Sequence, residues 1–75
     1  PMDALGVLEF TVPTSQKVSV DVYSMDGRLA KHIYTQELST GIQKAAISGS
    51  GLLPGLYIVH VKGTDFERFG RLIKQ

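Results

Sequence analysis

The stretch GLLPGLYIVHVKG, residues 51–63, decides the expected fold of this 75-residue chain. In it the pair Pro54-Gly55 stands directly before seven strand-forming residues, Leu56 to Lys62. Pro fixes φ and Gly permits a turn, so the pair predicts a loop that leads into a strand. Apolar residues occupy both faces in the first half of that strand. This is typical of a central strand that is covered on both sides or lies at an interface.

Period-two alternation continues on both sides of this stretch, whereas the apolar repeat of an amphipathic helix is not found. Residues 17–24 alternate valine with polar residues most clearly. Asp26-Gly27 predicts a hairpin turn, because Gly accepts the positive φ that tight turns need. We expect strands at residues 7–12, 17–24, 28–35, 42–47, 56–62 and 66–74, with loops at 36–41 and 48–55. Six or seven short strands predict an all-β fold, an antiparallel immunoglobulin-like β-sandwich.

Composition limits the classes of function. The chain has no cysteine, so it can form neither a disulfide framework nor a thiolate metal site. Its formal net charge of +1 gives no strong attraction to nucleic acid or to anionic membranes. No apolar run approaches the roughly 18 residues of a membrane span. A hydrophobic content of 43% is ordinary for a folded globular domain.

Residues 1–75 are expected to form a single domain, because the chain has room for only one core. Pro1 precedes Met2, so the chain is expected to be a fragment of a longer protein. Residues 1–6 are then a linker or a cloning remnant.

The sequence predicts no catalytic site, no metal site and no cofactor. The two histidines, His32 and His60, lack the spacing of a metal site. Ser19, Asp21 and His32 could meet across the first hairpin, but small β-domains often offer such a set by coincidence. The three tyrosines could form a sugar-binding platform, although core positions are the better interpretation. The phenylalanines Phe10, Phe66 and Phe69 are also expected in the core.

Several blocks of the chain together resemble the C-terminal sorting domains of the type IX secretion system. The most specific is Leu53-Pro54-Gly55-Leu56-Tyr57-Ile58-Val59, which is similar to the Pro-x-Gly-x-Tyr-Val-Val block of that family. Val22-Tyr23-Ser24-Met25-Asp26-Gly27-Arg28 resembles its strand that leads into a Gly-Arg turn, and Arg71-Leu72-Ile73-Lys74 resembles its basic-apolar-apolar-basic ending. The usual Asn-Pro opening is absent, and Gln75 after Lys74 is an unusual ending.

The resemblance implies a signal domain that directs a cargo protein, attached on its N-terminal side, across the outer membrane of Bacteroidetes and related bacteria. It implies recognition in the periplasm by components of the secretion system, then removal by a sortase-like peptidase at the cell surface. The cargo is then cell-surface or extracellular. The residues that match the sorting motif, with a structural or recognition role, are Asp26, Gly27, Arg28, Pro54, Gly55, Tyr57 and Val59. Recognition at the C-terminus is expected from Arg71, Leu72, Ile73, Lys74 and Gln75.

Two other classes of function remain open. An immunoglobulin-like spacer or carbohydrate-binding accessory module of a secreted enzyme would have the same fold. A small enzyme is disfavoured, because no convergent set of titratable residues is visible. Exposed strand edges also allow a weak dimer or the addition of a partner strand.

Overall fold

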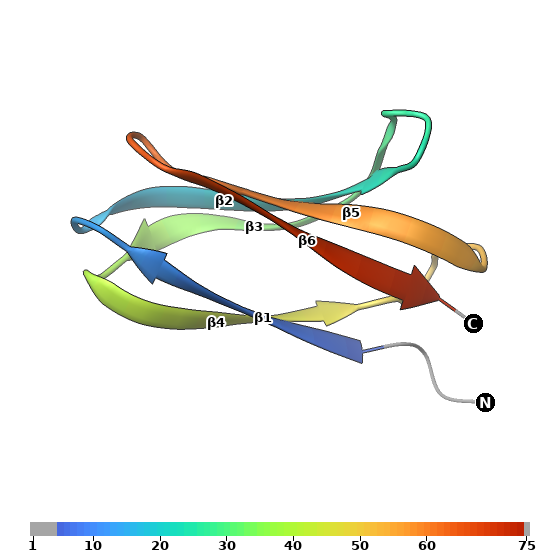
Figure 1. Ribbon diagram of the computed structural model, residues 1–75, viewed down its shortest axis with the longest axis horizontal. Coiled ribbons are helices and arrows are strands. Elements are labelled where there is room, and N and C mark those ends of the chain that lie inside the picture. Colours follow the sequence, from blue (N-terminus) through green and yellow to red (C-terminus); the bar gives the residue numbers. More distant parts are fainter. Residues whose placement is uncertain (1–4, 75) are drawn as a thin grey trace.

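The computed structural model describes residues 5–74, and this part of the chain forms six β-strands in two sheets (Figure 1). The strands are β1 (Leu5–Val12), β2 (Gln16–Ser24), β3 (Leu29–Leu38), β4 (Gly41–Ser48), β5 (Gly55–Lys62) and β6 (Glu67–Lys74). One sheet pairs β1 with β4, and the other has the order β3-β2-β5-β6, with antiparallel neighbours throughout. The predicted all-β antiparallel sandwich is confirmed. The described residues form no helix that could cross a membrane.

The core lies between the two sheets, and alternation along the strands explains which residues enter it. In β2 the valines at positions 18, 20 and 22 are fully buried, while the residues between them are partly exposed. Successive side chains of a strand point to opposite faces, so every second residue reaches the core. The buried apolar residues are Phe10, Val12, Val18, Val20, Val22, Ala45, Ile47, Tyr57, Val59, Val61 and Leu72. Burying one such Val or Leu side chain contributes about 1.5–3 kcal/mol.

β5 has the central position that its sequence predicts, between β2 and β6. Tyr57, Val59 and Val61 face the core and are buried. The opposite face of β5, which carries Leu56 and Ile58, is not covered by any described strand and is partly or fully exposed. The apolar residues on both faces of β5 therefore indicate one core face and one solvent-facing apolar face.

The predicted loop at residues 36–41 is wrong for most of its length. β3 continues to Leu38, and only Ser39 and Thr40 connect it to β4. Gln36, Glu37 and Leu38 pair with the first three residues of β2. β3 is an edge strand of its sheet, so polar residues there can stay in contact with water while their backbone pairs.

The prediction that Phe69 lies in the core is also wrong, because this side chain is 64% exposed. The register places Phe69 opposite His60 on the outer face of the sheet. The core-facing neighbour in β6 is Gly70, above which the Leu8 side chain packs so closely that an added Cβ would lie 2.8 Å from it. The other two phenylalanines follow the prediction more closely: Phe10 is buried, and Phe66 is partly buried and stacks on it.

The strands alternate in direction, so the connections gather at two ends of the sandwich (Figure 1). The Gln16 end holds the β1–β2, β3–β4 and β5–β6 connections. The Arg71 end holds the β2–β3 and β4–β5 connections, the start of β1 and the end of β6.

Gln16 closes its end of the sandwich through hydrogen bonds that involve both the nitrogen and the oxygen of its side-chain amide. Its Nε2 donates to the Thr14 carbonyl at 2.8 Å and to Asp65 Oδ1 at 2.7 Å. Its Oε1 accepts from the backbone N–H groups of Thr64 at 2.6 Å and Asp65 at 3.2 Å. Because a buried amide is costly only when unpaired, these bonds let Gln16 fix the β1–β2 turn against the β5–β6 turn.

Candidate functional site

The sequence-predicted site residues come from three separate segments, and all three lie at the Arg71 end. Asp26, Gly27 and Arg28 form the β2–β3 turn, and residues 71–74 end β6. Pro54 directly precedes β5, which begins at Gly55 and contains Tyr57 and Val59. The register brings the segments side by side, since Tyr57 lies opposite Ser24 on one side and Leu72 on the other. Gln75 lies outside the described residues.

Ser24 and Arg28 close the β2–β3 turn through their backbones. The Ser24 N–H donates to the Arg28 carbonyl at 2.9 Å, and the Gly27 N–H donates to the Ser24 carbonyl at 3.0 Å. Gly27 has a φ of +87°, which L side chains rarely adopt. The Asp-Gly pair therefore forms the predicted tight turn for the expected reason.

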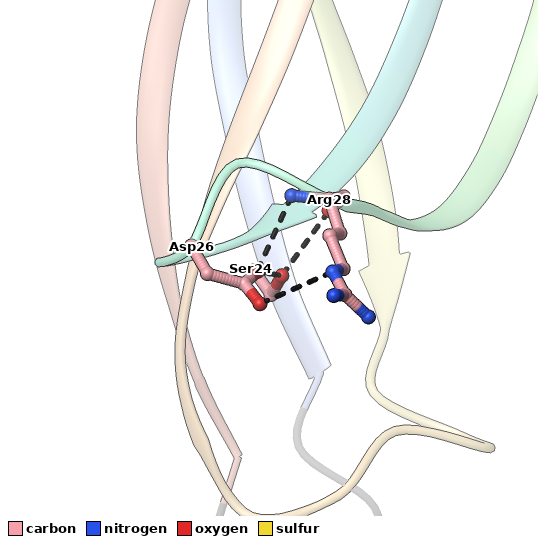
Figure 2. Close-up of polar contacts among 3 residues, drawn as sticks. All are labelled: Ser24, Asp26 and Arg28. Atoms are coloured by element: carbon pink, nitrogen blue, oxygen red, sulfur yellow. Dashed lines mark hydrogen bonds and ion pairs between the residues drawn. The ribbon is translucent and has the colours of Figure 1, made fainter.

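The Asp26 carboxylate organises the side chains of this turn (Figure 2). It accepts hydrogen bonds from the Ser24 hydroxyl and from the Arg28 N–H, the latter at 3.3 Å. The Ser24 bond, and then the Arg28 backbone bond, hold the pKa of Asp26 below its ordinary value of 3.8. Arg28 Nε lies 3.5 Å from Asp26 Oδ2, but both side chains are largely exposed, so this ion pair adds little stability.

The β4–β5 connection is fastened to the strands on either side of it. The Tyr57 hydroxyl donates to the Leu53 carbonyl at 2.6 Å, which folds the Leu-Pro-Gly segment back onto β5. Lys31 Nζ reaches from β3 to the carbonyls of Ser48 and Ser50 at 3.1 and 3.0 Å. These contacts give the Pro54-Gly55 block a defined position beside the β2–β3 turn.

The predicted site residues divide by burial into two groups. Tyr57, Val59 and Leu72 are buried in the core, so their side chains are not available to a partner. Asp26, Gly27, Arg28, Pro54, Gly55, Arg71 and Ile73 are exposed, and Lys74 is partly buried. The exposed group consists of the residues that a partner can contact at the Arg71 end.

Of the set Ser19, Asp21 and His32 that the sequence suggested, Asp21 and His32 meet on the outer face of the four-stranded sheet. His32 Nδ1 lies 2.5 Å from Asp21 Oδ1, and its Nε2 lies 3.2 Å from the Thr35 hydroxyl. Ser19 contacts Thr35 at 3.3 Å rather than His32. Nucleophilic catalysis would also need a substrate cavity and oxyanion donors beside the hydroxyl. Here these polar side chains lie on the exposed face of two neighbouring strands, and their contacts link β2 to β3.

Neither a tyrosine platform nor a metal cluster forms among the described residues. Tyr34 and Tyr57 face the core side of the sheet, and Tyr23 lies on the outer side near His60. Burial raises the pKa of Tyr34. No group of three metal-ligating side chains occurs between residues 5 and 74. A cavity of about 50 Å³ between β1 and β6 has room for a few water molecules only.

Sequence reasoning missed a group of exposed apolar side chains. Most of the large exposed apolar residues gather at the Arg71 end: Val7, Met25, Leu29, Leu53, Leu56 and Ile73. The signal that could have found part of this group is the second apolar face of β5. Leu56 and Ile58 have no described strand above them, so the pattern predicts a contact surface as well as a core strand.

Comparison with protein families gives a match over nearly the whole chain. The family model described as "Secretion system C-terminal sorting domain" matches residues 4–75. No curated protein and no solved structure gave a significant match. The matched range includes all six strands and both connections of the Arg71 end.

Proposed function

The chain belongs to the family of type IX secretion system C-terminal sorting domains, and we propose that residues 1–75 act as one export signal for a cargo protein joined on the N-terminal side. The cargo passes through the periplasm, crosses the outer membrane and reaches the cell surface or the medium. A sortase-like peptidase at the cell surface then removes the domain.

The family match over residues 4–75 carries this proposal. The geometry is consistent with it, because a signal read by a partner needs a stable scaffold and an exposed reading surface. Tyr57, Val59 and Leu72 belong to the scaffold, since their side chains are buried. The partner instead contacts exposed residues from separate segments, chiefly Arg28, Arg71 and Ile73.

The test is a fusion of residues 1–75 behind a periplasm-directed reporter in a bacterium with a working type IX system. We expect reporter at the surface or in the medium in this strain, and reporter retained in the periplasm of a secretion-null strain. The released reporter should lack the mass of the domain. Retention of a reporter whose domain is folded, in the competent strain, would contradict the proposal and favour an accessory module.

A second test concerns the C-terminal residues. Deleting residues 71–75 should abolish export, because it removes Arg71, Ile73 and the end of the edge strand β6. Because Leu72 is buried, the deletion also weakens the fold, so the paired variant Leu72→Ala measures that effect alone. Export that survives the deletion would mean that recognition lies elsewhere.

A further inference from the structure

An exposed apolar patch covers the outer face of the four-stranded sheet toward the Arg71 end. The outer patch consists of Arg71 and the residues Tyr23, Leu29, Leu56, Ile58, Phe69 and Ile73. Leu29, Phe69 and Ile73 are 58%, 64% and 62% exposed. Large contiguous apolar patches on soluble domains mark interaction sites, whereas single exposed apolar residues need no explanation.

Strand register makes the outer patch continuous across all four strands. Leu29 of β3 lies opposite Tyr23 of β2, which lies opposite Ile58 of β5. Ile58 in turn lies opposite Arg71 of β6. Phe69 and Ile73 stand two residues before and after Arg71 on the same strand, and therefore on the same face. Arg71 is thus a cation with apolar neighbours on three sides.

The acidic residues of β2 and β6 on this face contact histidines rather than Arg71. Asp21 pairs with His32, and Glu67 pairs with His60, each at 2.5 Å. None of the ion pairs among residues 5–74 includes Arg71, whose side chain is exposed. An unpaired guanidinium in apolar surroundings is well suited to a carboxylate, which it can bind through two parallel hydrogen bonds.

We propose that the outer patch is the docking surface for a component of the secretion machinery that presents apolar side chains around one carboxylate. The proposal rests on the export function above and names the surface and the chemistry of its partner. The carboxylate binds Arg71, and the apolar side chains cover Leu29, Ile58 and Ile73. Residues that dominate binding energy are enriched in arginine and tyrosine and are surrounded by contacts that exclude water, as Arg71 would be here.

The chemistry of the outer patch favours this occupant over two others. A second copy of the domain would bring another Arg71 and no new carboxylate from the patch itself. An anionic bilayer attracts proteins through several clustered cations, whereas this patch holds one and the whole chain has a net charge of +1. One carboxylate on an apolar protein surface matches the single cation.

The experiment compares charge reversals on β6 in the reporter fusion. Arg71→Glu should lower export about tenfold or more, because it places a like charge against the partner carboxylate. Arg71→Lys should keep part of the export. The matched control is Arg68→Glu, which makes the same charge change on the other face of the same strand and should leave export unchanged. Circular dichroism and thermal melting of each purified domain verify that the variants fold.

Three results would overturn the inference while leaving the export function intact. One is wild-type export together with equal export of Arg71→Glu. Another is sedimentation of the purified wild-type domain as a dimer that Arg71→Glu dissociates, which would make a second copy the occupant. The third is binding of the wild type, but not of Arg71→Glu, to phosphatidylglycerol-containing vesicles, which would make it a lipid surface. Failure of the wild-type fusion to be exported would instead overturn the proposed function.

A suppressor selection tests whether the partner group that contacts Arg71 is a carboxylate. Selection for restored export of the Arg71→Glu fusion should yield suppressors that replace an Asp or Glu of the secretion machinery by a neutral or basic residue. Suppressors found only within residues 1–75 would contradict a carboxylate on the machinery.

Discussion

At the Gln16 end polar groups are buried and bonded, whereas at the Arg71 end apolar side chains are exposed. Gln16 makes bonds to both neighbouring turns, and Phe66 packs on Phe10 beside it. The Arg71 end is held by the Tyr57 and Lys31 bonds to carbonyls, and it leaves Leu29, Leu56 and Ile73 in solvent. The difference indicates that one end closes the fold while the other is available to a partner.

This comparison predicts that glycine substitutions will have unequal effects at the two ends. Gly63→Ala at the Gln16 end should destabilise the domain by about 3 kcal/mol, because the new Cβ would lie 2.3 Å from the Phe66 ring and 2.4 Å from Gln16 Oε1. In Gly51→Ala at the Arg71 end the new Cβ would meet no atom within 4 Å. This variant should lose only about 1 kcal/mol of stability, because alanine rarely adopts the φ of +83° found there. Denaturant melts of the two variants measure the difference, and equal losses would contradict it.

The next largest effect concerns the hydrogen bonds that fasten each end. Gln16→Leu should cost about 2 kcal/mol, because it leaves the N–H groups of Thr64 and Asp65 without their acceptor. Tyr57→Phe removes one bond, to the Leu53 carbonyl, and should cost about 1 kcal/mol. Urea unfolding followed by far-UV circular dichroism measures the free energy of unfolding of both variants. A larger loss for Tyr57→Phe would place the main fastening at the Arg71 end.

Substitution within the outer patch should change stability least among these variants. Leu29→Ser replaces an exposed side chain on an edge strand, so the free energy of unfolding should change by no more than about 0.5 kcal/mol. Thermal melting measures this. A loss comparable to that of Gln16→Leu would mean that Leu29 is part of the folding core.

The smallest effect is a change in titration at the β2–β3 turn. The pKa of Asp26 is lowered in the folded state, so its bonds stabilise the turn above pH 3.8 and are lost as the pH falls through the lowered pKa. Ser24→Ala removes the largest cause and should raise the pKa of Asp26 toward 3.8. Carboxyl carbon shifts in an NMR titration report this. Ser19→Ala, whose hydroxyl contacts Thr35 instead, is the control and should leave the titration unchanged.

Local signals were sufficient to predict most of the fold. The valines of β2, the Asp26-Gly27 turn and the Pro54-Gly55 pair each act through neighbouring residues, so sequence alone locates them. The end of β3 was missed because Gln36 and Glu37 lie on an edge strand, where pairing of the backbone needs no apolar alternation. Phe69 was misplaced because an aromatic residue in a strand fits either face, and the register with β5 decides which.

The candidate site could be predicted only in part. Resemblance to the family identified the motif residues, but not that the three segments meet at one end, which follows from strand directions. The outer patch draws Leu29, Tyr23, Ile58 and Arg71 from four strands, and their adjacency depends on three separate registers. No sequence window contains this set. That no ion pair among residues 5–74 includes Arg71 is likewise visible only in three dimensions.

The most direct test of the division between the two ends uses one pair of isoleucines in the export fusion. Ile73 and Ile42 are 62% and 68% exposed, and they lie at the Arg71 end and the Gln16 end. We predict that Ile73→Ser lowers type IX-dependent export about tenfold, as expected for an apolar side chain that the partner covers, whereas Ile42→Ser leaves it unchanged. Equal export from both variants, or a greater loss for Ile42→Ser, would contradict the account.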